Sequence, residues 1–285
     1  NPANVREVVP GVTNLTLQDA INLTEHGRSL VVVSNRAYVA CGYGGLKVYS
    51  LADPAQPVLL DMVDVGKDEH ADHLWVDGAR VYLAVNERGL MILDATDPTN
   101  ITVLGEYRDG TPFFGPVCVE SNRAYVAMNT DLAVIDVHDP ASPALLGQIR
   151  VSAVATHIHG LAVQGATAYC ANYTEGLKTV DAADPASMRI TATNECKPIG
   201  ICDSAARDVA VRGEYLFLVR DGYGLVSFSL ADPLKPAGAD QFVPSDVPFP
   251  YDALERVWLD GTTAVVIGGS NVWFVDTSDP LEMAE

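Results

Sequence analysis

Hydrophobic and polar positions form short blocks along the chain. Residues 31–54 read VVVSNRAYVACGYGGLKVYSLADP, in which apolar runs are separated by a polar gap and then by a glycine-rich gap. Short runs rich in β-branched and aromatic residues, bounded by Gly, Asn and Asp, are typical of β-strands joined by turns. The stretch therefore predicts strands and turns rather than helices.

The block recurs along the chain. An apolar run such as GLKVYS, GLMILD or DLAVID stands before each Asp-Pro pair, and a run such as RAYVA or RVYLA stands before that. An earlier run, such as LWVDG, opens each repeat, and a further run such as PALLGQIRV usually follows the Asp-Pro pair. The pairs begin, about 45 residues apart, at Asp53, Asp97, Asp139, Asp184, Asp232 and Asp279. Four short strands in a repeat of this length are typical of one β-propeller blade.

The pattern predicts an all-β fold, a six-bladed β-propeller of four-stranded antiparallel blades in one domain, residues 1–285. The runs are apolar on both faces, as expected for sheets that are covered on both sides. The sixth repeat ends in LEMAE, without an outer strand, while the N-terminal piece GVTNLTLQDAINLTEH aligns with PVLLDMVDVGKDEH of the first repeat. We expect residues 13–22 to pair beside residues 271–276 and to close the ring.

The Asp-Pro pairs predict a structural role. Proline sets the backbone dihedral of the second turn position, and the aspartate carboxylate can accept hydrogen bonds from turn amides. We therefore interpret these aspartates as turn residues and not as catalytic groups.

The repeats resemble the LVIVD-repeat family of β-propeller proteins. The stretches that carry the resemblance are GLKVYSLADPAQP, GLMILDATDPTNI and DLAVIDVHDPASP, with the AYVA-type strand before them. The resemblance implies the fold and leaves the activity open. It also implies a secreted, periplasmic or cell-surface protein, because most members are secreted or attached to the surface.

Charge and cysteine content narrow the choice of partners. With 18 basic and 37 acidic residues the formal net charge is −19, which disfavours nucleic acid and anionic membrane surfaces. No apolar run approaches the roughly 20 residues needed to span a bilayer, so we expect no membrane insertion. The sequence has no CxxC motif; Cys196 and Cys202 either form a small-loop disulfide or stay reduced, and Cys118 and Cys170 suit the core. The oligomeric state is left open.

Ligands of propellers usually bind where the loops that lead into the innermost strands converge with the loops between the second and third strands. When the repeats are aligned on the AYVA-type strand, His26, His70 and His157 share one column, and His73 and His159 follow two or three residues later. Five of the six histidines therefore lie in these inner-strand loops. The clustering predicts a functional site.

Further polar and aromatic residues are expected at the same end, with carboxylates at Asp72, Asp208 and Asp221. The catalytic candidates are His26, His70, His157, Arg207 and Tyr251. The substrate-binding candidates are Tyr43, His73, Phe113, Phe114, His159, Tyr173, Arg220, Tyr223 and Arg256.

Three chemistries fit this set. The histidines His26, His70 and His157 could bind a divalent metal such as Zn²⁺, or the carboxylates could bind Ca²⁺, although no DxDxDG loop is present. Alternatively, His and Tyr act as acid and base while Arg binds a substrate carboxylate. No GxSxG, P-loop or HExxH motif is present.

Two functions follow. The first is an enzyme, a hydrolase or lyase, that acts on a small polar or acidic substrate, including carbohydrates, by acid–base or metal-assisted chemistry. The alternative is a non-catalytic binding module for protein or glycan partners, because the fold alone does not choose between them.

Overall fold

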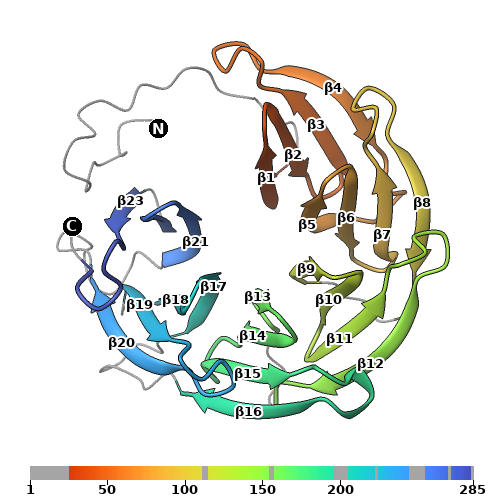
Figure 1. Ribbon diagram of the computed structural model, residues 1–285. Coiled ribbons are helices and arrows are strands. Elements are labelled where there is room, and N and C mark those ends of the chain that lie inside the picture. Colours follow the sequence, from red (N-terminus) through yellow and green to blue (C-terminus); the bar gives the residue numbers. More distant parts are fainter. Residues whose placement is uncertain are drawn as a thin grey trace. The chain divides into compact units, whose positions relative to one another are not determined.

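The computed structural model describes residues 26–110, 115–153, 157–195, 205–221, 224–243, 254–268 and 271–283. These residues form 23 β-strands and a 3₁₀ turn, η2 (Pro185–Ser187). The strands are grouped into six antiparallel sheets, each built from strands consecutive in the sequence (Figure 1). Within the described residues, no helix has the length and apolar character needed to cross a membrane.

Each sheet is one blade. Blade 1 comprises β1 (Ser29–Val33), β2 (Arg36–Ala40), β3 (Leu46–Ser50) and β4 (Val58–Val63). Blade 2 comprises β5 (Ala71–Asp77), β6 (Arg80–Val85), β7 (Gly89–Asp94) and β8 (Thr102–Tyr107). Blade 3 comprises β9 (Val117–Glu120), β10 (Arg123–Met128), β11 (Asp131–Asp136) and β12 (Ala144–Arg150).

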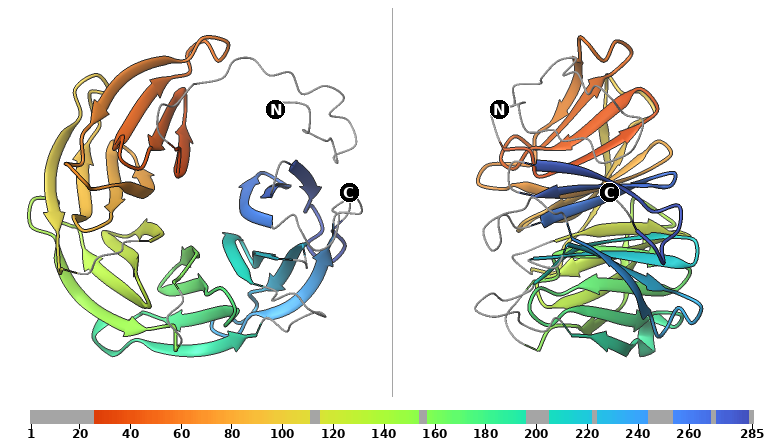
Figure 2. Two further views of the ribbon diagram at one scale, coloured as in Figure 1. Left: turned by 180° about the vertical axis from the view of Figure 1, so that it is seen from behind. Right: turned by 90° about the vertical axis from the view of Figure 1, so that its left-hand side faces the viewer.

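The second half of the chain continues the series. Blade 4 comprises β13 (Gly160–Gln164), β14 (Thr167–Ala171), β15 (Leu177–Asp181) and β16 (Arg189–Asn194). Blade 5 comprises β17 (Ala206–Arg212), β18 (Tyr215–Arg220), β19 (Gly224–Ser229) and β20 (Ala237–Phe242). Blade 6 comprises β21 (Leu254–Asp260), β22 (Thr263–Gly268) and β23 (Asn271–Asp276). The strands of each sheet twist relative to one another, as the two views of Figure 2 show.

The predicted fold class is confirmed: the chain is a six-bladed β-propeller of antiparallel sheets. Blade 6 has three strands among the described residues, and the N-terminal segment that we expect to complete it, residues 13–22, lies outside them. The chain divides into two compact units, the N-unit with blades 1–3 and the C-unit with blades 4–6. One domain over residues 1–285 stays a prediction.

The hydrophobic core lies between neighbouring sheets within each unit. In the N-unit, Tyr38 and Leu46 of blade 1 pack with Leu83 of blade 2, and Ile92 on the other side of blade 2 packs with Ile135 of blade 3. The C-unit repeats the arrangement on both sides of blade 5. Full burial of one such side chain contributes about 1.5–3 kcal/mol to stability. Blades 2 and 5 are thus apolar on both faces because both faces are covered.

The Asp-Pro pairs have the predicted structural role. In each of the six turns, one carboxylate oxygen of the aspartate accepts a hydrogen bond from the amide N–H two residues later, at 2.9–3.1 Å. These turns connect the third strand of each blade to the segment that follows it. The aspartates are therefore turn residues, as the sequence indicated.

The strand register repeats with a period of three blades. In blades 1 and 4, the second and third strands end on the pairs Ala40–Leu46 and Ala171–Leu177. The end pairs are Val85–Gly89 and Arg220–Gly224 in blades 2 and 5. They are Met128–Asp131 and Gly268–Asn271 in blades 3 and 6. Each blade of the N-unit therefore has a counterpart of the same turn length in the C-unit.

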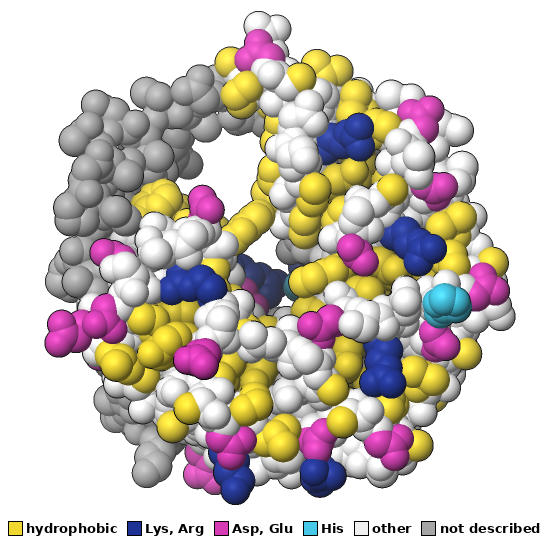
Figure 3. All heavy atoms as spheres, in the orientation of Figure 1, with side chains coloured by type: hydrophobic (Ala, Val, Ile, Leu, Met, Phe, Trp, Pro, Cys, Tyr) yellow, Lys and Arg dark blue, Asp and Glu magenta, His cyan; other side chains and the backbone are white. Residues whose placement is uncertain are grey.

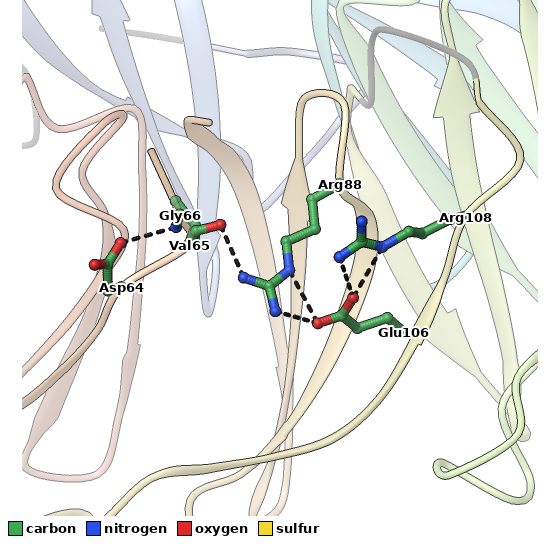
Figure 4. A network of polar contacts seen from close by, with 6 residues as sticks. All are labelled: Asp64, Val65, Gly66, Arg88, Glu106 and Arg108. Atoms are coloured by element: carbon green, nitrogen blue, oxygen red, sulfur yellow. Dashed lines mark hydrogen bonds and ion pairs between the residues drawn. The ribbon is translucent and has the colours of Figure 1, made fainter. Parts of the chain in front are cut away.

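Polar side chains also tie blades together inside the N-unit (Figure 4). Arg88 donates through Nε to Glu106 Oε1 at 2.9 Å and through Nη1 to the carbonyl of Val65 at 2.8 Å. Arg108 binds the other oxygen, Glu106 Oε2, at 2.6–3.0 Å. Since Val65 follows blade 1 and the other three residues belong to blade 2, the network connects neighbouring sheets.

The surface mixes charged and apolar groups, as the face in Figure 3 shows. Outer strands carry exposed hydrophobic residues, among them Leu59 of β4, Val103 of β8 and Leu145 of β12. The predicted cysteine positions are confirmed for Cys118 and Cys170, which are buried in β9 and β14. Cys196 and Cys202 lie outside the described residues.

Candidate functional site

The strand register shifts the predicted histidine column. Ser29, His73 and Gly160 are paired with the equivalent residues Ala40, Ala84 and Ala171. A register shift between Ala71 and His73 adds one residue after His70, so His70 is displaced by one position relative to His26 and His157. His26 and His157 are exposed, whereas His70 is largely covered, with a side chain 24% exposed.

A β-bulge shapes the innermost strands of blades 2, 5 and 6. The register shifts between Ala71 and His73 in β5, between Ala206 and Asp208 in β17, and between Leu254 and Arg256 in β21. The extra residues are Asp72, Arg207 and Glu255. A bulge re-aims the side chain it carries, and in blades 2 and 5 this side chain is central to a polar cluster.

The N-unit cluster, defined as Arg28, Tyr43, His70 and Asp72, joins blades 1 and 2. His70 Nδ1 lies 2.8 Å from Asp72 Oδ2, and Arg28 Nε lies 3.8 Å from Asp72 Oδ1. The ring of the exposed Tyr43 meets the His70 imidazole edge to face, with centroids 5.4 Å apart. His70 Nδ1 and Asp72 Oδ2 are both buried, and neither forms a well-aligned hydrogen bond with a described residue, so their contact is mainly electrostatic.

Burial raises the pKa of Asp72 above its ordinary value, although the positive charges of His70 and Arg28 and the contact with His70 act against the rise. The surroundings of Asp72 therefore disfavour an unpaired negative charge, and a positively charged neighbour stabilises the carboxylate.

The C-unit cluster, defined as His159, Tyr173, Arg207 and Asp221, joins blades 4 and 5. The His159 and Tyr173 rings stack with centroids 5.1 Å apart and an interplanar angle of 27°. The Arg207 guanidinium carbon lies 4.8 Å from the centroid of the Tyr173 ring. Arg207 Nε and Nη2 both lie 2.7 Å from Asp221 Oδ2. The Tyr173 ring thus contacts both His159 and Arg207.

Positive charge dominates the surroundings of His159. Burial, together with the positive charges of Arg207, His157 and Arg256, lowers the pKa of His159 to about 4. Arg256 also donates through Nη1 to the His159 carbonyl at 3.4 Å. At neutral pH the imidazole is therefore uncharged, which suits hydrogen bonding better than charge pairing.

A buried carboxylate lies between the innermost strands of the C-unit. Asp208 Oδ1 accepts from the amide of Val209 at 2.9 Å, and Oδ2 accepts from the amide of Val257 on β21 at 3.1 Å. Burial raises the pKa of Asp208 to about 6, against the charge of Arg256 and these two hydrogen bonds. Asp208 thus bridges blades 5 and 6 and serves the scaffold.

Other candidates have different placements. Phe113, Phe114, Tyr223 and Tyr251 lie outside the described residues. His73, in β5, is half-buried. Arg220, at the end of β18, lines a cavity of about 420 Å³ together with Thr193, Asn194, Glu195, Leu218, Phe228 and Gly238.

The described residues form no recognisable metal site. They contain no group of three or more His, Cys, Asp or Glu side chains placed to hold a metal ion. His26 and His70 belong to the N-unit and His157 to the C-unit. The proposal that these three histidines bind a metal stays a prediction.

The sequence interpretation missed Asn172. This residue is 0% exposed, and its side-chain Oδ1 and Nδ2 find no hydrogen-bond partner in the described part of the chain. Asn172 occupies the position of Cys41 in blade 1, where a smaller, less polar side chain is found. The sequence signal that could have identified Asn172 is a polar residue at the end of an otherwise apolar strand.

The class of protein is thus set by the fold, a six-bladed β-propeller. Within it, the chain contains LVIVD repeats: the family model of the LVIVD repeat matches residues 68–109, 116–151, 157–193 and 204–226. The predicted resemblance is confirmed in these four stretches. No curated protein sequence matches the chain.

Solved structures share the fold. A protein from Lactobacillus plantarum is 14% identical, with a TM-score of 0.69 over 88% of this chain and 80% of that one. A putative 6-phosphogluconolactonase from Bacteroides fragilis is 10% identical, with a TM-score of 0.65 over 88% and 80%. BamB from Moraxella catarrhalis is 13% identical, with a TM-score of 0.61 over 93% and 75%. At such identities the likeness concerns the fold alone.

Proposed function

We propose that the protein is an enzyme that acts on a small polar substrate by acid–base catalysis, with His70 as the group that transfers the proton. The observation that carries the proposal is the 2.8 Å separation of His70 Nδ1 and Asp72 Oδ2 at a largely covered position. A carboxylate beside one ring nitrogen orients the imidazole and selects its tautomer. With the proton on Nδ1, the lone pair of Nε2 is available to accept a proton from water or substrate.

The imperfect alignment of this contact is compatible with catalysis. Catalytic hydrogen bonds are often long or poorly aligned in a free enzyme and tighten when substrate binds. Arg28, 3.8 Å from the second carboxylate oxygen, favours the charged form of Asp72. A charged Asp72 stabilises the imidazolium that forms when His70 has taken a proton.

Hydrolysis and elimination are the two reaction classes that such a histidine serves. In hydrolysis, His70 removes a proton from the attacking water and returns it to the leaving oxygen; in elimination, it removes a carbon-bound proton. The putative 6-phosphogluconolactonase with the same fold makes sugar lactones the first substrates to test.

The test is the hydrolysis of glucono-δ-lactone and glucuronolactone by purified protein and its variants. We expect His70→Ala to lower kcat/KM by about 10²–10⁴-fold, because general acid–base catalysis contributes that much. Asp72→Asn should lower it by about 10–100-fold, as for lost orienting partners. His138→Ala is the matched control, since His138 is exposed in the Asp139-Pro140 turn. Unchanged turnover in His70→Ala contradicts the proposal.

A non-catalytic binding module for protein or glycan partners is the second candidate. The C-unit cluster favours it, because Tyr and Arg are the residue types that dominate recognition sites. Capture of a glycan or protein ligand by the parent protein and by His70→Ala alike, with no turnover in either, would favour binding over catalysis.

We further propose that the protein works outside the cytoplasm, as a secreted, periplasmic or cell-surface protein. The net charge of −19 and the LVIVD repeats support this location. Fractionation of cells that express the natural protein, followed by immunoblotting, tests it, and a purely cytoplasmic signal contradicts it.

A further inference from the structure

Tyr173 occupies a backbone position at which glycine is the expected residue. Its φ is 44°, and the equivalent residue in blade 1 is Gly42, with a φ of 56°. Both residues form the same isolated bridge to the next blade, Gly42 with Ala71 and Tyr173 with Ala206. Left-handed backbone is accessible to glycine without a steric penalty but costs a tyrosine of order 1 kcal/mol. The ring of Tyr173 should therefore contribute something that glycine cannot.

The contacts of the ring indicate what that is. One contact is the stacked imidazole of His159, and the other is the guanidinium of Arg207. Asp221 takes Nε and Nη2 of Arg207, which fixes the plane of the guanidinium. The bonds to Asp221 use two of the five N–H groups of the guanidinium. A guanidinium fixed in this way, with N–H groups not used by Asp221, suits a planar oxyanion.

Local charge favours the same kind of ligand. The charged groups that act on His159 are Arg207, His157 and Arg256, and all of them are basic. Asp221, which pairs with Arg207, and Asp208, on which Arg256 acts, offset part of this positive charge. The basic groups near His159 still favour a negatively charged ligand over a neutral one.

Two polar side chains, one in the cluster and one next to it in the sequence, contain buried atoms that have no hydrogen-bond partner among the described residues. Asn172, which directly precedes Tyr173, has neither amide atom satisfied among the described residues and is 0% exposed. Asp221 Oδ1 is also buried and has no hydrogen bond to a described group. A buried polar group without a partner costs about 1–3 kcal/mol, so such groups in a native protein call for a bound partner. Asp221 Oδ1 can accept a hydrogen bond from a hydroxyl group.

We propose that His159, Tyr173 and Arg207 form a binding site for a small hydroxylated carboxylate, of the sugar-acid class. The carboxylate lies against Arg207 and the neutral His159, which donate to it, and a hydroxyl group of the ligand donates to Asp221. The Tyr173 ring holds both donors in place. The site is independent of the catalytic role proposed for His70, which belongs to the other unit.

Calorimetric titration with galacturonate, glucuronate and neutral galactose tests this site. We expect the parent protein to bind at least one uronate at least tenfold more tightly than galactose. Arg207→Lys should weaken uronate binding at least tenfold, because lysine cannot reproduce the fixed fork. Tyr173→Gly should weaken it similarly while the unfolding free energy stays close to that of the parent, because glycine fits the backbone. Tyr173→Phe, which keeps the ring, should bind like the parent.

Arg189→Lys is the matched control, since Arg189 also pairs with a carboxylate, Asp181, but at an exposed place on β16. It should leave uronate binding unchanged. The proposal is overturned if the parent binds neither uronate at about 10 mM, if galactose binds equally well, or if Arg207→Lys binds like the parent. These outcomes are separate from those for His70, which are measured as turnover of lactones.

Discussion

Blades 1 and 2 of the N-unit are joined by the same backbone arrangement as blades 4 and 5 of the C-unit. The side chains at these two places differ. Gly42 and Tyr173 make equivalent bridges, and the equivalent bulges place Asp72 in one unit and Arg207 in the other. The N-unit therefore offers a carboxylate beside a histidine, while the C-unit offers a guanidinium beside a tyrosine. The difference teaches that the blade backbone sets where a side chain lies, and that the residue at the bulge sets the chemistry.

Among the substitutions that compare the two units, Gly160→Ala is expected to have the largest effect on stability. A Cβ on Gly160 would lie 2.6 Å from Asp208 Cα and 2.7 Å from Asp208 Oδ1. Ser29, which carries a Cβ, holds the equivalent position in the N-unit. Because backbone atoms must move, we expect Gly160→Ala to lower the unfolding free energy by about 2–4 kcal/mol.

Urea denaturation measures this loss. Gly238→Ala is the control, since an added Cβ there meets only Phe228 Cε1, at 4.0 Å. If Gly160→Ala and Gly238→Ala have equal unfolding free energies, Asp208 does not make the expected close contact with β13 at Gly160.

The next effect concerns pH, and two residues of the C-unit act in opposite directions. Asp208, with its pKa raised to about 6, contributes stability at low pH that is lost as the pH rises through that value. His159, with its pKa lowered to about 4, contributes stability above its ordinary pKa of 6.5 that is lost as the pH falls toward 4.

Relative to the parent, Asp208→Asn should gain up to about 3 kcal/mol of unfolding free energy as the pH rises from about 4 to about 6. His159→Gln should instead lose stability relative to the parent over the same interval. Urea unfolding at a series of pH values measures both differences. Curves that stay parallel to that of the parent would contradict the assigned pKa directions.

The smallest effect compares the bridge residues themselves. Gly42→Ala adds a Cβ with no atom closer than 3.8 Å, so only its φ of 56° matters. We expect a loss of about 1 kcal/mol. Tyr173→Gly relieves the same strain and should change stability by less than about 0.5–1 kcal/mol, because the flexible unfolded chain offsets the gain. A loss of several kcal/mol in Tyr173→Gly would make the ring a structural element.

Sequence reasoning predicted the blades well because their signal is local and repeated. Each blade shows alternating runs and turns on its own, and the Asp-Pro turns form the expected hydrogen bond. The histidine column was only partly predictable, because the register shift between Ala71 and His73 displaces His70 by one position. The pairing of His70 with Asp72 and of Tyr173 with His159 was not, since both depend on side-chain directions.

The chain by itself determined the number of blades, the order of their strands and the end at which the loops gather, because strand periodicity and turn residues act over a few positions. Only the tertiary structure decided that Tyr173 of blade 4 lies against Arg207 of blade 5, and that Asp208 is enclosed between three innermost strands. The physical reason is that bulges and positive-φ turns redirect side chains by geometry that residue type alone does not encode, and that burial, which sets charge and strain, exists only once neighbouring sheets pack.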